Sequence, residues 1–88
     1  MDRIDEAVDL LSETDNINKE VLGPEHPQSL TSSANLATFL SLQGSLDKAV
    51  ELERHVWNIR QKCLGPAHID TLTSQANLSG TLFQMGYL

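Results

Sequence analysis

The feature that most constrains this chain is a repeat with a period of 42 residues. Residues 22–27 read Leu-Gly-Pro-Glu-His-Pro, and residues 64–69 read Leu-Gly-Pro-Ala-His-Ile. When residues 4–46 are aligned with residues 46–88, 19 of the 43 aligned positions are identical. A fixed period of this length is typical of repeat architectures, in which one supersecondary unit is used again and again. The sequence therefore predicts a repeat array.

Each repeat contains two segments with the apolar periodicity of helices. We expect helices over residues 3–21, 27–43, 46–64 and 69–86. Glycines end these segments, because they adopt the left-handed conformation that closes a helix; they are Gly23, Gly44, Gly65 and Gly86. No segment alternates with a period of two, so strands are not expected. The predicted fold class is all-α, with four antiparallel helices.

The two helices of a unit differ in composition. The first and third segments carry the same apolar stripe. Its residues are Ala7, Leu10, Leu11, Ile17 and Val21, with Thr14 in the remaining place, in one copy, and Ala49, Leu52, Val56, Ile59 and Cys63 in the other. The second segment is rich in small side chains, among them Ser29, Ser32, Ser33, Ala34 and Ala37. Small residues on two faces let other helices approach closely. We therefore expect the second helix to lie between two neighbours.

Length and composition restrict the class of protein. A chain of 88 residues is one small domain with little room for a sizeable core. The formal net charge of −6 argues against nucleic acid and anionic membranes as partners, because both demand a cationic face. No apolar run approaches the roughly 20 residues that span a bilayer, and the acidic N-terminus lacks a signal peptide's apolar region. Cys63 is the only cysteine, so no disulfide forms within the chain. A cytoplasmic protein fits these observations.

The repeated motifs resemble a known family. They are Leu-Gly-Pro-Glu-His-Pro at residues 22–27, Ala-Asn-Leu-Ala at residues 34–37, and Gln-Gly-Ser-Leu-Asp-Lys-Ala-Val-Glu-Leu at residues 43–52. With their period of 42 residues, they resemble the tetratricopeptide repeats of kinesin light chain. The same repeat type is familiar from sensor arrays of fungal and bacterial signalling ATPases. The resemblance covers essentially the whole chain and implies antiparallel helix pairs, A then B, stacked into a right-handed α-solenoid.

The resemblance also implies where a partner binds. The second and fourth segments are similar to A helices, and the first and third to B helices, which gives the order B-A-B-A. The concave wall of such a solenoid is mostly helix A and holds a peptide or protein segment. The resemblance places Asn35 and Asn77, which precede the central leucine of each A helix, on this wall. The other expected groove residues are Thr31, Thr38, Ser41, Thr73 and Gln84.

Two features depart from a complete family array. Ile69 stands where the family has proline, so we expect the last helix to begin less sharply than the helix at Pro27. Residues 1–88 form a single domain of two units in shifted phase, which ends at Tyr87–Leu88 and lacks the polar capping units of a solenoid. We therefore expect a fragment of a longer array. Its last helix leaves part of its apolar surface uncovered, which favours dimerisation; the residues concerned are Leu72, Ala76, Leu82 and Phe83.

Four side chains invite a chemical interpretation. His26 and His68 occupy equivalent loops, and neither lies near a second histidine or a carboxylate cluster. We interpret both as capping or loop-packing residues. Cys63 lies on the apolar stripe of its helix, which indicates packing rather than nucleophilic chemistry. Trp57 either anchors a partner or covers the seam between units, and we favour packing.

The charged residues of segment 46–64 indicate a solvated face. They are Lys48, Arg54, Arg60 and Lys62, interspersed with Glu51 and Glu53. The chain contains no close acid–base pair, no glycine-rich phosphate loop and no metal-spaced cluster, which argues against a third class, an enzyme or a cofactor-binding bundle.

We therefore expect a non-catalytic module, with no catalytic, cofactor or metal site, that binds a protein or peptide on its A-helix wall. The alternative is a self-assembly element whose open ends dock head to tail or swap a helix between copies, giving a homo-oligomer.

Overall fold

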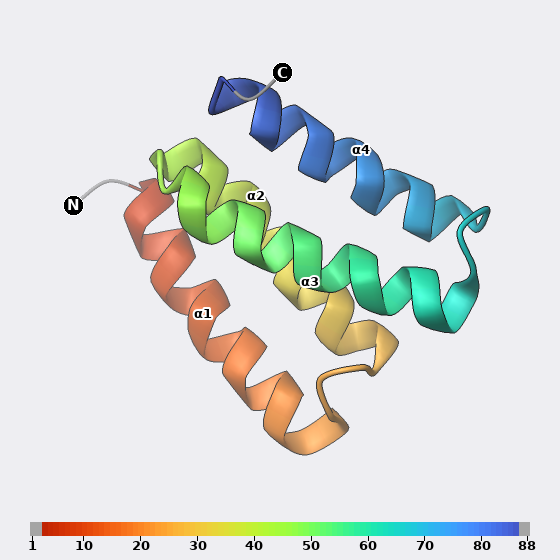
Figure 1. Ribbon diagram of the computed structural model, residues 1–88. Coiled ribbons are helices and arrows are strands. Elements are labelled where there is room, and N and C mark those ends of the chain that lie inside the picture. Colours follow the sequence, from red (N-terminus) through yellow and green to blue (C-terminus); the bar gives the residue numbers. More distant parts are fainter. Residues whose placement is uncertain (1–2, 87–88) are drawn as a thin grey trace.

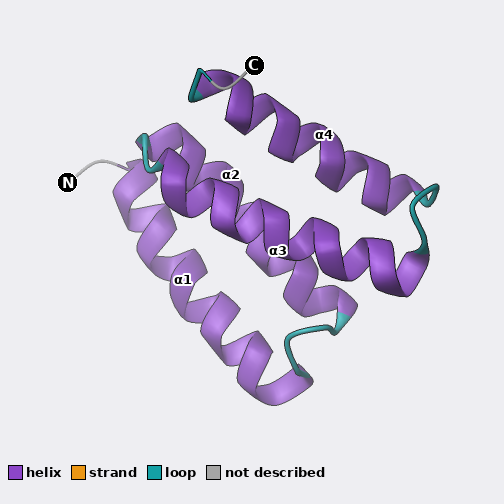
Figure 2. Ribbon diagram, in the orientation of Figure 1, coloured by secondary structure: helices purple, strands orange, loops and turns teal. Residues whose placement is uncertain are grey.

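The computed structural model describes residues 3–86, which form four helices (Figure 1). These are α1 (Arg3–Leu22), α2 (Pro27–Gln43), α3 (Leu46–Leu64) and α4 (Ile69–Gln84). No strand occurs among the described residues (Figure 2). The predicted all-α class is confirmed, and the first three helices begin and end within one residue of the predicted bounds. Residues 1–2 and the predicted C-terminal end at residues 87–88 lie outside the described part of the chain.

The fourth helix ends earlier than the sequence indicated, at Gln84 rather than Gly86. The backbone N–H of Met85 donates to the carbonyl of Thr81 at 3.1 Å, but that of Gly86 donates to the carbonyl of Phe83 at 3.0 Å. This shorter-range hydrogen bond tightens the last turn. Gly86 then adopts a φ of 86°, as expected of a residue that closes a helix.

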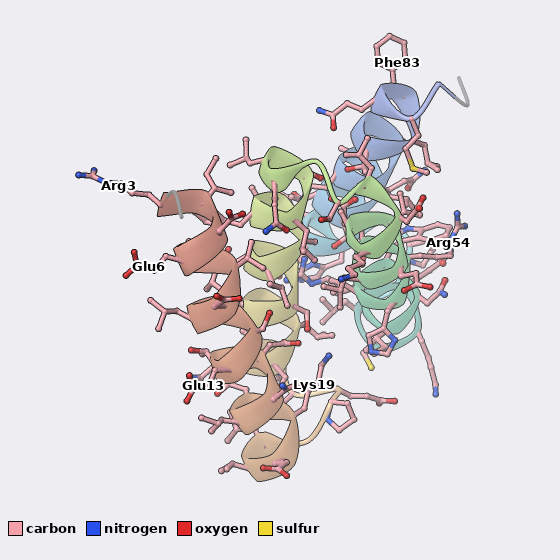
Figure 3. All side chains as sticks on the ribbon, turned by 90° about the vertical axis from the view of Figure 1, so that its left-hand side faces the viewer. Arg3, Glu6, Glu13, Lys19, Arg54 and Phe83 are labelled. Atoms are coloured by element: carbon pink, nitrogen blue, oxygen red, sulfur yellow. The ribbon has the colours of Figure 1, made fainter. Side chains whose placement is uncertain are left out.

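Each helix packs mainly against its neighbours in the sequence: α1 on α2, α2 on α3, and α3 on α4. The result is a flat slab with dimensions of 40 × 37 × 16 Å. Figure 3 shows α1 at one edge of the slab and α2 between α1 and α3. Packing between sequence neighbours is typical of solenoids, whose units bury their surface against adjacent units rather than around one centre.

The small side chains of α2 let both neighbours approach closely. Ser29, Ser33 and Ala37 have at most 1% of their surface exposed. Two apolar clusters link α2 to the helices beside it; one contains Val8, Leu36, Leu40 and Ala49, and the other contains Leu30, Val56 and Ile59. The expectation that the second helix lies between two neighbours is therefore confirmed.

The apolar stripe of α1 is less buried than its spacing indicates. Leu10, Ile17 and Val21 are 59%, 51% and 74% exposed, whereas the buried residues of α1 are Val8 and Asp15. The reason is that, among the described residues, α1 packs mainly against α2. No described residue covers the part of its apolar surface that faces away from α2.

The two Gly-Pro-x-His loops cap the A helices in the same way. Nδ1 of His26 accepts a hydrogen bond from the backbone N–H of Gln28 at 3.0 Å. Nδ1 of His68 accepts one from the backbone N–H of Asp70, also at 3.0 Å. Each bond satisfies one of the N–H groups that the first turn of a helix leaves without a partner. The interpretation of both histidines as capping residues is therefore confirmed.

The start of α4 does not depend on proline. This helix begins at Ile69, just as α2 begins at Pro27. The backbone before the two helices is nearly identical, with φ and ψ of −64° and 139° at His26 and of −67° and 142° at His68. The expectation of a less sharp start is therefore wrong, because the histidine cap is common to both helices.

The seam between α1 and α2 contains a buried carboxylate. Asp15 is 3% exposed, and its Oδ1 accepts hydroxyl hydrogen bonds from Ser32 at 2.8 Å and from Ser33 at 2.6 Å. Its Oδ2 pairs with Nζ of Lys19 at 2.9 Å. Burial raises the pKa of Asp15, but these three partners outweigh burial and hold the pKa below its usual value. The ionised carboxylate is thus fully partnered.

Candidate protein-binding groove

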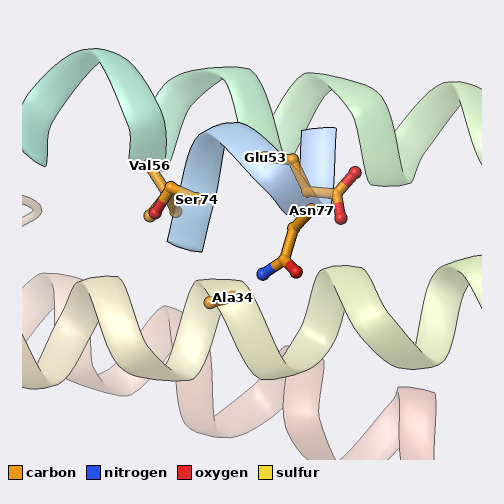
Figure 4. A pocket seen from close by; sticks show the side chains of 5 residues that line it. All are labelled: Ala34, Glu53, Val56, Ser74 and Asn77. Atoms are coloured by element: carbon orange, nitrogen blue, oxygen red, sulfur yellow. The ribbon is translucent and has the colours of Figure 1, made fainter. Parts of the chain in front are cut away.

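The A helices α2 and α4 enclose a hollow whose floor is α3. The hollow has a volume of about 300 Å³, and its lining residues are Thr38, Ser41, Leu42, Glu53, Ala76, Asn77, Gly80, Thr81 and Gln84. A pit of about 10 Å³ adjoins it, lined by Ala34, Glu53, Val56, Ser74 and Asn77 (Figure 4). Glu53 and Asn77 line both spaces, which we together call the groove.

The walls of the groove carry hydroxyl and amide groups but no charge. The hydroxyl oxygens of Ser41 on α2 and Thr81 on α4 lie 3.5 Å apart. The Thr81 hydroxyl donates to the carbonyl of Asn77 at 3.1 Å, and the Thr38 hydroxyl donates to the carbonyl of Ala34 at 3.1 Å. These bonds to the preceding helical turn orient the threonine side chains. None of the residues that α2 and α4 contribute to the groove is ionisable.

The structure brings four of the predicted groove residues together. Thr38, Ser41, Asn77 and Gln84 line the hollow between the A helices. Ser41 is half-buried, whereas Thr38, Asn77 and Gln84 are exposed. The groove therefore presents two hydroxyl groups on its α2 wall and two amide side chains on its α4 wall.

Three predicted residues lie elsewhere. Asn35 and Thr73 are exposed and line neither space, and Thr31 lies near the loops. Asn35 occupies on α2 the place that Asn77 occupies on α4, so it faces the side on which a preceding A helix belongs. Residues 3–86 contain no such helix. The Thr73 hydroxyl donates to the carbonyl of Ile69 at 2.9 Å, within its own helix.

The floor of the groove holds a buried carboxyl group. Glu53 is 8% exposed, and its Oε1 has no hydrogen-bond partner among the described residues. Burial raises the pKa of Glu53, and the nearby Thr81 hydroxyl lowers it only in part. Figure 4 shows the Glu53 side chain reaching from α3 into the space between the helices, beside Asn77. The expectation that Glu53 lies on a solvated face is wrong.

A comparison of the two units in the sequence contains a signal that Glu53 is buried. It occupies the place that Leu11 has in the first unit, and Leu11 packs against an apolar core cluster. Glu53 also lies four residues after Ala49 and three before Val56, both of which are buried. Helical spacing thus places it on the inner face of α3. The sequence prediction missed it because Glu53 stands among other charged residues of segment 46–64, which were interpreted together as a solvated face.

A third hollow, of about 200 Å³, lies where the two Gly-Pro-x-His loops approach each other. Thr31, His68 and Cys63 contribute to its lining. Cys63 is exposed, so its predicted packing role is wrong. Arg60 is half-buried rather than solvated, because its Nη1 donates to Oγ of Ser74 at 2.7 Å and joins α3 to α4.

Within residues 3–86, no three histidine, cysteine, aspartate or glutamate side chains gather as they do around a metal ion. None of the helices in that part of the chain is both long and apolar enough to cross a membrane.

Helices that pack in sequence order, equivalent loops one period apart and a groove between the A helices define a helical repeat protein. A family model described as tetratricopeptide repeat matches residues 1–62. Because the match spans most of the sequence, the chain belongs to the tetratricopeptide repeat family, whose members are protein–protein interaction modules. A search of the curated proteins finds no match to this chain.

Proposed function

We propose that the chain binds a peptide segment of another protein in the groove between α2 and α4. The observation that carries this proposal is the hollow of about 300 Å³ between the two A helices, which form the concave wall in this family. That volume is at the lower end of the range for ligand pockets. It suits a few side chains of a bound segment rather than a folded domain.

Amide and hydroxyl groups are suited to a peptide backbone. Asn77 and Gln84 each carry a carbonyl acceptor and an NH₂ donor, so they pair with either backbone group of a bound segment. Thr38 and Ser41 add hydroxyl groups to the opposite wall. Recognition of this kind depends little on the sequence of the segment. Selectivity must then come from the residues on the floor of the groove.

Asn77 and Asn35 provide a matched pair for testing the site, because they are equivalent residues of which only Asn77 lines the groove. The probe is a peptide selected on the wild-type protein from a phage-displayed library of random linear peptides. We expect Asn77→Ala to weaken its binding about fivefold, since a lost hydrogen bond contributes about 1 kcal/mol, and Asn35→Ala to leave it unchanged. Titration calorimetry measures both affinities. Equal effects of the two variants would contradict the proposed groove.

A second candidate function, self-assembly, is favoured by the outer faces of the slab. Ile69 and Phe83 of α4 are 73% and 67% exposed, and Leu10 and Val21 of α1 are 59% and 74% exposed. These apolar faces lie on the first and last helices of the slab. A second copy that docks α1 against α4 covers both faces and continues the stack.

We also propose that the two units form one domain and are of the 42-residue type found in kinesin light chain. The proposal is supported by the Gly-Pro-x-His loops, which recur at this period and cap both A helices through histidine.

A further inference from the structure

The groove contains one ionisable group. Glu53 is the only titratable side chain that lines the hollow or the pit, as residues 3–86 define them. Its Oε1 is buried and has no hydrogen-bond partner among those residues. Arg60, seven residues further along α3, donates to Oγ of Ser74 at 2.7 Å, and the ion pairs among the described residues do not include one between Arg60 and Glu53. The described chain therefore supplies no cation to this carboxyl group.

The fold does not require a carboxyl group at this place. In the first unit the equivalent residue is Leu11, which packs against an apolar cluster. The surroundings of Glu53 also differ from those of Asp15, which has two hydroxyl donors and a lysine as partners. Buried charges in proteins are normally paired or hydrogen-bonded. Among the described residues, Glu53 has the Thr81 hydroxyl nearby but forms no ion pair. A carboxylate without a cationic partner on the floor of a groove is thus complementary to a cation that enters the groove.

We propose that the groove selects peptide segments that carry a lysine or arginine side chain, whose charged group pairs with the Glu53 carboxylate. This inference rests on the proposed function and names the chemistry of the segment that is bound. The net charge of −6 favours a basic segment over an acidic one. A buried pair of this kind distinguishes a basic side chain from a neutral one, because only the basic side chain both hydrogen-bonds the carboxylate and neutralises its charge.

The shape of the hollow fits a long basic side chain. Ala76 and Gly80 line the α4 wall, and a Cβ atom at Gly80 would meet nothing within 4 Å. The wall therefore leaves room for the aliphatic stem of lysine or arginine, whose charged end reaches beyond the stem. Asn77 lies beside Glu53 (Figure 4). Its amide oxygen supplies a second acceptor for the several N–H groups of such a side chain.

The test compares Glu53→Gln with Glu51→Gln, which removes the same charge from an exposed position of the same helix. A phage-displayed library of random linear peptides is selected on the wild-type protein and on each variant, and circular dichroism checks that the helices are retained. We expect peptides selected on wild type and on Glu51→Gln to share a lysine or arginine. Replacing this basic residue of the peptide by norleucine should weaken binding to the wild-type protein at least about tenfold. The same replacement should weaken binding to Glu53→Gln by less than about twofold.

The pH dependence of binding gives a second readout. Pairing with a cation requires ionised Glu53, and burial raises the pKa of this group in the free protein. We therefore expect the affinity of a basic peptide for wild type to fall on acidification, and the affinity for Glu53→Gln to change little. No titratable residue of α2 or α4 faces Glu53 in the groove. An affinity that rises on acidification would instead indicate a protonated Glu53 that donates to a peptide carbonyl, and would overturn the proposal.

The outcomes separate this inference from the proposed function. Peptides that bind the groove with no dependence on a basic residue would overturn the inference and leave the proposed function standing. A library that yields no binding peptide would count against both. If Glu53→Gln fails to fold, replacing the shared basic residue of the peptide by glutamate tests the same pair on the wild-type protein. We then expect a loss of binding larger than that caused by norleucine.

Discussion

The two buried carboxyl groups of this chain, Asp15 and Glu53, have opposite surroundings. Asp15 lies at the seam of α1 and α2 with three partners, and its pKa is lowered. Glu53 lies on the floor of the groove, its Oε1 lacks a partner in residues 3–86, and its pKa is raised. Asp15 therefore stabilises the fold in its ionised form, whereas ionised Glu53 destabilises it. Each difference has a consequence for stability that depends on pH.

Asp15→Asn is expected to lower the free energy of unfolding by about 1–3 kcal/mol at neutral pH, because the charged partner of Lys19 and of two serine hydroxyls is lost. The pKa of Asp15 is lower in the folded state than in the unfolded state. The stabilisation by Asp15 is therefore complete above the pKa of the unfolded state, and it is lost as the pH falls through the pKa of the folded state. Urea unfolding at several pH values measures the difference. Asp9→Asn, at an exposed position of α1, is the control. A loss that does not depend on pH would contradict this account.

Glu53→Leu is expected to raise the free energy of unfolding by about 1–3 kcal/mol at neutral pH, because an unsatisfied buried group is replaced by the residue type of the first unit. The pKa of Glu53 is higher in the folded state than in the unfolded state. The destabilisation by ionised Glu53 is therefore absent below the pKa of the unfolded state and complete above the pKa of the folded state. The gain should therefore disappear on acidification. Urea unfolding against Glu51→Leu, a solvent-exposed control, measures it. A loss of stability at neutral pH would show that Glu53 has a partner.

The helices begin and end through local chemistry that repeats in each unit. His26 and His68 cap α2 and α4. After α2, Gly44 adopts a φ of 94° and donates to the carbonyl of Ser41, while Ser45 donates to the carbonyl of Leu40. This pattern is a Schellman motif, which satisfies carbonyl groups that the end of a helix leaves free. Such caps depend on short stretches of sequence.

His68→Ala is expected to destabilise the chain by about 1 kcal/mol, because the backbone N–H of Asp70 loses its acceptor. His68→Asn should restore most of the loss, since asparagine is a favoured capping residue. His55→Ala, at an exposed position inside α3, is the control and should cost nothing. Thermal unfolding followed by circular dichroism compares the three variants. If asparagine fails to restore stability, the contribution of His68 is not a cap.

The bounds of the helices were predictable because caps and glycines act locally, within a few residues. Burial was less predictable, because it depends on which neighbours a helix has. Val21 and Cys63 fit an apolar stripe and are exposed, whereas Glu53 and Arg60 looked solvated and lie against other helices. The dependence on neighbours also explains why Asn35 does not line the groove. Asn35 is equivalent to Asn77 in the repeat, but residues 3–86 contain no A helix on the side of α2 that Asn35 faces.

At the scale of the whole molecule, the four described helices form a row rather than a bundle around one centre. The two units are similar in backbone but not in their seams. Asp15 is replaced at the equivalent place by Trp57, which is half-buried and whose Nε1 has no partner in residues 3–86. The polar contacts of the seams also differ, because Asp15 joins α1 to Ser32 and Ser33 of α2, whereas Arg60 of α3 donates to Ser74 of α4. The outermost helices retain apolar faces.

If self-assembly occurs through these faces, the mean mass of the protein in solution should rise with concentration. Phe83→Ser should then raise the dissociation constant about tenfold or more, because burial of a phenylalanine side chain contributes about 1.5–3 kcal/mol. Gln84→Ser, at the next exposed position of α4, should have little effect. Sedimentation equilibrium measures both. A monomer at every concentration would remove self-assembly as a candidate function.

The arrangement of helices in a row has a consequence for how such a chain lengthens. Since each helix touches mainly the one before it and the one after it, an in-frame duplication of 42 residues at the turn between α2 and α3 leaves the distant contacts as they were. Only the junctions at the inserted copy have to fit. Each added copy also brings its own A helix, and under the proposed function it adds one more groove whose selectivity depends on a single residue of the neighbouring B helix.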